Sequence, residues 1–222
     1  MRNRFTFSVG VLVVALAASC VPTSTNPLSP VTEARHDPQL IGLWAGKPPD
    51  EHDDVVWVHF VEAEDSMTDI ICVAAEREGA DLMFYKMHPT TVGKNAYMNL
   101  KRGIPDNLIP DDKAEQLRKD LQAGNCILAK YEVSGDVLKI WTMTDKIGDA
   151  IQSGKLKGTV KKGKWLSNIT ITDSPEHMAK FLQTAEHAEI FDLLLVCKRV
   201  KPPSIPKASA DGKREKGGQK ER

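Results

Sequence analysis

The stretch ILAKYEVSGDVLKIWT, residues 127–142, contains the pattern that decides the fold class. In residues 127–133 apolar side chains occupy every second position, from Ile127 to Val133, with Lys130 and Glu132 between them. Such alternation is typical of a β-strand with one buried face. The next three residues, 134–136, are Ser-Gly-Asp, a tight-turn sequence, and a second apolar run follows at 137–142. The stretch therefore predicts an antiparallel hairpin.

Similar apolar runs separated by turn residues occur on both sides of this hairpin. The further candidate strands are residues 40–45, 55–62, 69–75, 81–88, 96–101, 168–172 and 191–200. A second tight turn, Glu-Gly-Ala-Asp at 78–81, joins two of them. Short turns link antiparallel neighbours, so the sequence predicts an all-β, up-and-down meander. Short strands at regular spacing favour a barrel or a sandwich.

Three segments with helical patterns interrupt the meander. They are Asp111–Gln122, Thr144–Ser153 and Ser174–Glu186. The last has Ser174 as a candidate N-cap and Pro175 at the first helical position. It precedes the final strand, so we expect two or three short helices, one of them just before that strand.

Composition places the chain among ordinary globular proteins. It has 222 residues, 41% of them hydrophobic and 6% aromatic, and four cysteines. These values exclude a fully disordered chain, a collagen, a coiled coil, a disulfide-dense miniprotein and a polytopic membrane protein. One domain, residues 40–200, is expected.

The charges are balanced in total but not along the chain. The sequence has 30 Lys plus Arg and 30 Asp plus Glu. Residues 1–19 carry a net charge of +2, residues 20–200 carry −6, and residues 201–222 carry +4. The neutral total argues against a nucleic-acid partner. The basic tail, which we expect to be disordered, predicts contact with an anionic surface or a protein partner.

The N-terminus has the pattern of a secretory signal peptide. Arg2 and Arg4 precede a 14-residue apolar run, residues 5–18, which is shorter than the roughly 20 residues of a transmembrane helix. The sequence Ala15-Leu16-Ala17 fits the A-x-A pattern of signal peptidase I. Cleavage by signal peptidase I is thus one alternative, and the other, cleavage by signal peptidase II, rests on the residues that follow.

The end of this run, Leu16-Ala17-Ala18-Ser19-Cys20, resembles the lipobox of bacterial lipoproteins, although Ala17 stands where Leu is usual. The resemblance implies that Cys20 becomes the acylated N-terminus, carrying fatty acids such as palmitate, and that signal peptidase II cleaves. Val21, in place of Asp, implies the outer membrane, with the domain facing the periplasm. Residues 20–39 are rich in Pro, Ser and Thr and are expected to form a flexible tether. The alternative is a protein secreted to the periplasm.

The remaining cysteines, Cys72, Cys126 and Cys197, each lie in an apolar run. The sequence allows one disulfide with one free thiol, or three buried thiols. Their spacing matches no zinc site, and no metal or cofactor is expected.

Gly42 and Trp44 form a Gly-x-Trp motif on the first strand. This motif resembles the opening signature of lipocalins, and a meander followed by a helix and a last strand is also lipocalin-like. The resemblance implies a closed barrel in which Trp44 plugs one end and a basic residue, Arg199, packs on it. A lipocalin-like barrel implies a small apolar ligand or lipid.

The aromatic residues and one histidine on the strands are the candidate ligand-binding residues: Trp57, His59, Phe84, Tyr97, Tyr131 and Trp141. The pattern does not decide which face of each strand points inward. Asp111–Gln122 is a candidate lid over one mouth. Known catalytic motifs are absent from the sequence, which favours a binding protein over an enzyme. The alternative is a structural or accessory lipoprotein with a filled barrel, acting through surface and tail contacts.

Overall fold

The computed structural model describes residues 21–33, 36–49, 55–63, 67–76, 79–103, 125–163, 167–185 and 187–201. The predicted signal, Cys20, the helix at Asp111–Gln122 and all of the tail beyond Lys201 lie outside these residues. The all-β prediction is confirmed: the protein is a closed antiparallel barrel of eight strands with short helices, one of them before the last strand.

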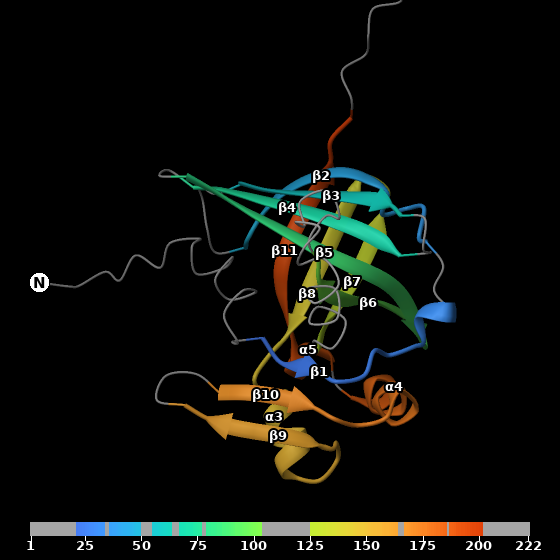
Figure 1. Ribbon diagram of the computed structural model, residues 1–222, viewed down its shortest axis with the longest axis vertical. Coiled ribbons are helices and arrows are strands. Elements are labelled where there is room, and N and C mark those ends of the chain that lie inside the picture. The colour runs from blue at the N-terminus through green and yellow to red at the C-terminus, as the bar shows by residue number, and fades with distance from the viewer. Residues whose placement is uncertain are drawn as a thin grey trace, which may run out of the picture.

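The barrel strands follow one another in chain order, and the last closes the sheet (Figure 1). They are β2 (Gly42–Lys47), β3 (Val55–Glu62), β4 (Thr68–Glu76), β5 (Gly79–Val92), β6 (Asn95–Arg102), β7 (Cys126–Ser134), β8 (Val137–Met143) and β11 (Phe191–Arg199). β11 pairs with β8 on one side and with β2 on the other, which closes the ring. The hairpin between β7 and β8 turns at Gly135, whose φ of +59° favours glycine.

Between β8 and β11 the chain forms a small module below the barrel (Figure 1). It contains α3 (Ile147–Gln152), β9 (Gly158–Lys162), β10 (Ser167–Ile171), α4 (Pro175–Thr184) and α5 (His187–Ile190). Ser174 caps α4 as predicted, accepting a hydrogen bond from the backbone N–H of His177 at 3.2 Å. The sequence pattern predicts β10 but not β9, because GTVKK alternates weakly and faces solvent over most of its length.

Residues predicted to form a flexible tether pack against the fold instead. β1 (Thr23–Ser24) pairs antiparallel with β7 and parallel with β10, and a short 3-10 helix, η1, follows at Val31–Glu33. Leu28 is buried, and its N–H donates to the Asn99 side chain at 2.7 Å. The tether prediction is therefore wrong for residues 21–33. The composition of this segment shows no strand or helix periodicity, but its backbone pairings with β7 and β10 and the burial of Leu28 hold it on the fold.

The apolar side chains form two separate cores. The first, the barrel core, fills the inside of the barrel and includes Trp44, Phe60 and Tyr85. The second core lies outside, where the module covers the outer faces of β6 and β7. Its buried members are Leu28, Val92, Tyr97, Cys126, Leu128, Met143, Ile147, Ala150, Leu156, Ile169, Ile171, Met178, Leu182, Ile190 and Phe191. This division determines which residues can meet a ligand.

Candidate functional site

One end of the barrel is closed by a tryptophan and an arginine. The Trp44 ring is fully buried, and its indole N–H donates to the Leu40 carbonyl at 2.7 Å. The Arg199 guanidinium lies 4.1 Å from the centre of that ring and donates to the carbonyls of Ile41, at 2.7 Å, and Gln39. This arrangement combines a cation–π contact with backbone hydrogen bonds, so it fixes the plug firmly. Gly42, at φ +120°, allows the chain to pass beside Arg199.

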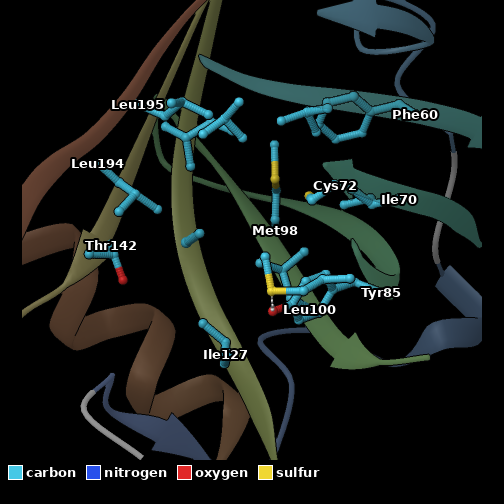
Figure 2. A pocket seen from close by; sticks show the side chains of 15 residues that line it. Phe60, Ile70, Cys72, Tyr85, Met98, Leu100, Ile127, Thr142, Leu194 and Leu195 are labelled. Atoms are coloured by element: carbon cyan, nitrogen blue, oxygen red, sulfur yellow. Dashed lines mark hydrogen bonds between the residues drawn. The ribbon is translucent and has the colours of Figure 1, made fainter. Parts of the chain in front are cut away.

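Toward the opposite end, the barrel core contains a cavity of about 70 Å³ (Figure 2). Every barrel strand except β2 contributes to its wall. The lining residues are Val56, Val58, Phe60, Ile70, Cys72, Met83, Tyr85, Met98, Leu100, Ile127, Ala129, Ile140, Thr142, Leu194 and Leu195. Almost all of these side chains are apolar, so the cavity suits an uncharged apolar group.

The cavity wall extends to the end of the barrel where β6 ends and β7 begins. Leu100 pairs with Ile127 there, and both line the cavity. The segment that connects these two strands contains the predicted lid, Asp111–Gln122, which lies outside the described residues. The lid remains a prediction.

The few polar atoms of the wall are uncharged. Burial raises the pKa of the Cys72 thiol to about 12. The pKa of Tyr85 is also raised, by burial first and then by Cys72, and its hydroxyl lies 3.5 Å from the Met83 sulfur. The Thr142 hydroxyl has no hydrogen-bond partner among the described residues. Burial thus favours the neutral forms of Cys72 and Tyr85, in keeping with the apolar character of the rest of the wall.

Three of the predicted ligand residues face away from the cavity. Along β3 the inward side chains are Val56, Val58 and Phe60, which places Trp57 and His59 on the outer surface. On β5 the inward residues are Met83 and Tyr85, so Phe84 points outward. The predictions for Trp57, His59 and Phe84 are therefore wrong. Residues 55–61 are apolar on both faces, and alternation alone could not choose between them.

The other three predicted residues are divided among different surroundings. Tyr97 is buried in the second core, on the outer face of β6, with its ring centroid 6.0 Å from that of Phe191. Trp141 lies on the outer face of β8, with the Lys130 ammonium 5.0 Å from its ring centre. Tyr131 does face inward, but its hydroxyl donates to Asp37 at 2.8 Å. None of the six lines this cavity, and only Tyr131 borders the second hollow described below.

Most residues lining the cavity are aliphatic or sulfur-containing side chains, and Phe60 and Tyr85 are its two aromatic members. A usable indication was present in β7, where the inward positions Ile127, Ala129 and Tyr131 follow from the alternation. Extending that register across the sheet requires the strand pairings, in which Ala129 faces Met98 on one side and Thr142 on the other. Those pairings are a property of the folded sheet.

A second hollow, of about 590 Å³, lies between the N-terminal segment and the turn from β5 to β6. Its wall is more polar and includes Ser29, Asp37, Thr90 and Tyr131. Beneath it, Asn99 accepts from the N–H of Leu28 and donates to the Thr90 hydroxyl at 2.8 Å. The N-terminal segment, through Leu28, Ser29 and Asp37, therefore forms one wall of the hollow.

The three described cysteines are free thiols, so of the two arrangements the sequence allows, the structure shows three thiols and no disulfide among them. Burial raises the pKa of Cys126 to about 11 and that of Cys197 to about 12. Within the described residues, no group of three or more His, Cys, Asp or Glu side chains could hold a metal ion.

The fold and the site define a closed β-barrel with an apolar interior cavity. Comparison of the chain with protein-family models, with curated proteins and with solved structures finds no match. In the part of the chain that the structure describes, no helix has the length and apolar character needed to cross a membrane.

Proposed function

We propose that this protein is an envelope lipoprotein, acylated at Cys20, whose barrel binds a narrow apolar ligand such as the end of a lipid chain. The observation that carries the ligand part is the apolar cavity between Val56, Met98 and Ile140. The anchor rests on the lipobox-like sequence at 16–20 and on its likeness to bacterial lipoproteins. By the same likeness, the domain faces the periplasm from the outer membrane.

The size of the cavity limits the ligand. Typical pockets for whole small molecules have volumes of roughly 300–1,000 Å³. A volume of about 70 Å³ holds only a few carbon atoms. The group that enters is therefore thin and unbranched, with the rest of the ligand outside the wall formed by Leu100 and Ile127. A chain end fits this description and a bulky ring system does not.

Extraction of the protein purified from its native membrane tests this proposal. An organic extract analysed by mass spectrometry should contain a hydrophobe in a fixed ratio to protein, because the acyl chains on Cys20 are covalent and stay behind. Ala129→Phe projects a ring into the cavity and should abolish the co-extracted hydrophobe. Ala80→Phe places the same ring on the exposed outer face of β5 and should leave the ratio unchanged.

Thermal unfolding shows whether both variants are folded. A folded Ala129→Phe protein that still releases the hydrophobe in the original ratio would refute binding in the cavity. The same holds for a wild-type extract without any hydrophobe. Metabolic labelling with a radioactive fatty acid, compared between wild type and Cys20→Ala, tests the anchor separately. An unlabelled wild-type protein would rule out acylation.

The small volume also supports a second candidate function. Most of the barrel core is filled by side chains, including the fully buried Trp44 and Met87. A filled barrel suits an accessory lipoprotein that acts through its surface and its basic tail. Deletion of residues 202–222 tests this, because partner capture from solubilised envelopes should then fall while hydrophobe extraction stays constant. Unchanged capture would exclude the tail as the contact.

A further inference from the structure

The first described residues leave little free chain between Cys20 and the fold. β1 begins at Thr23, three residues after Cys20, and Pro22 is already buried. An extended chain covers at most about 3.6 Å per residue, so Cys20 lies within about 11 Å of the start of β1. An acyl group on Cys20 would therefore hold the domain directly at the bilayer surface, with one particular face toward it.

The strand pairings show which face this is. β1 runs parallel to β10, with Thr23 opposite Thr170. Because parallel strands point the same way, the chain before Thr23 comes from the edge of the sheet at which β10 starts. At that edge Ser167 pairs with Lys162, and Asn168 pairs with Lys161. Figure 1 shows β1 and β10 starting on the same side, with the end of β9 beside them.

The charges at this edge are all of one sign. Its described residues, 160–163 and 167–169, include Lys161 and Lys162 and no Asp or Glu, within a domain whose residues 20–200 carry a net charge of −6. Lys161 and Lys162 are both exposed. Neighbouring strands are about 4.8 Å apart, which places Lys161 about 10 Å from β1. Two exposed lysines thus lie at the same edge of the sheet as the start of β1, two strands away from it.

The edge cannot swing freely relative to the barrel. Ile169 and Ile171 of β10 are buried in the second core together with Leu128 of the barrel wall. At Gly158 a β-carbon would come within 2.6 Å of the Thr170 carbonyl oxygen, so β9 is closely fitted to its partner. A lipid on Cys20 would therefore orient the whole domain, and not only this edge, relative to the membrane.

We propose that the edge formed by Lys161, Lys162 and the start of β1 lies against the membrane and binds anionic phospholipid headgroups. This inference rests on the proposed acylation of Cys20 and adds the face that the domain presents. It also places Ile127, which pairs with Thr23 and lines the cavity, on the side of the barrel nearest to the lipid. A lipid chain end would then have a short path into the cavity.

Lysine labelling in proteoliposomes tests the proposal. The full acylated protein is reconstituted in vesicles of phosphatidylcholine alone or of phosphatidylcholine mixed with phosphatidylglycerol, and exposed to a membrane-impermeant amine-reactive ester. A surface potential of about −30 mV lowers the local pH by roughly half a unit, so labelling near the anionic surface slows about threefold. Lys161 and Lys162 should show this slowing. Lys94 and Lys198, which are exposed near the Trp44 end, should not.

Two controls separate this proposal from the anchor itself. Vesicle flotation reports anchoring, and protein that does not float overturns the anchor and this inference together. Protein that floats but labels Lys161 and Lys162 at equal rates in both vesicle types overturns the inference alone. Equal slowing at Lys94 and Lys198 also overturns it, because that result means no preferred face. With Cys20→Ala, the difference between vesicle types should disappear, as it should at 1 M salt, where the screening length is about 3 Å.

Discussion

The barrel core and the second core are built from the same kinds of side chain but are packed differently. The barrel core retains a cavity beside Ala129 and an unpartnered hydroxyl on Thr142 among the described residues. In the second core, Leu182 of α4 packs against the outer face of the barrel wall and is almost fully buried. Each barrel strand is hydrogen-bonded on both sides, so the wall cannot move inward to fill a gap. A helix has no backbone bonds to its neighbours and approaches to a distance set by side chains.

Polar contacts also distinguish the two regions. Asp173 is 3% exposed and accepts hydrogen bonds from the N–H groups of Lys157 and Ser174 and from the His177 ring at 2.6 Å. Its own carbonyl accepts from Asn26 at 2.9 Å. One residue thus joins β9, α4 and the N-terminal segment. The cavity wall has no comparable junction among the described residues, which leaves its interior suited to a guest.

The largest expected effect concerns the packing of α4. Leu182→Ala should lower the free energy of unfolding by about 3 kcal/mol, because it leaves a cavity in a close-packed core. Leu100→Ala, at the edge of the existing cavity, should cost about half as much, because Leu100 has already lost contacts on one side. Urea denaturation measures both. Equal losses in the free energy of unfolding for Leu182→Ala and Leu100→Ala would show that the two cores do not differ in packing.

The next effect tests the junction at Asp173. Asp173→Asn should cost about 2 kcal/mol at neutral pH, since a buried carboxylate with several donors is lost. Burial raises the pKa of Asp173, but the hydrogen bonds from Lys157, His177 and Ser174 outweigh it and hold the pKa below its ordinary value of 3.8. The stabilisation is therefore complete above the unfolded-state pKa and is lost as pH falls through the folded-state pKa.

Urea midpoints measured from roughly pH 6 to pH 2 provide the check for this junction. The gap between wild type and Asp173→Asn should be constant down to about pH 4 and then narrow. A gap that stays constant over the whole range would show that the charge of Asp173 does not contribute.

A smaller effect concerns the closed end of the barrel. Arg199→Lys should cost about 1.5 kcal/mol, because an ammonium cannot stack on Trp44 and also bond the carbonyls of Ile41 and Gln39. Lys198→Ala, on the exposed face of the same strand, should change stability by less than about 0.5 kcal/mol. Tryptophan fluorescence during urea unfolding follows both. A cost for Arg199→Lys no larger than that of Lys198→Ala would show that the plug is not energetically important.

The smallest effect is a gain in stability. The hydroxyls of Thr142, in the cavity wall, and Thr144, where β8 leaves the barrel, are both buried without a partner among the described residues. Valine at either position removes that cost and should stabilise by about 1 kcal/mol. Differential scanning calorimetry detects such a shift. A gain for Thr144→Val but a loss for Thr142→Val would mean that the cavity holds a polar guest at Thr142.

Sequence patterns predicted the barrel better than the module. All nine predicted strands are present, because alternation and tight turns such as the one at Gly135 are local properties. β9 and β1 were missed because neither has an alternating apolar face. β9 is stabilised by pairing with β10. β1 is stabilised by pairing with β7 and β10, which are both distant from it in sequence. The packing of residues 21–33 was missed for the same reason.

The amino-acid sequence by itself determined the all-β class and the antiparallel meander of the barrel strands, and a resemblance to the lipocalin motif implied the contact of Arg199 with Trp44. The alternation of side chains and the residues of a tight turn are local properties, so they can be recognised from the sequence alone. Only the tertiary structure decided that Val58 and Met83, and not Trp57 and Phe84, face the interior. When a strand is apolar on both faces, its own sequence does not decide which face is buried inside the barrel. That face is fixed only when all eight strands pair and the barrel closes. The interior cavity depends on that closure.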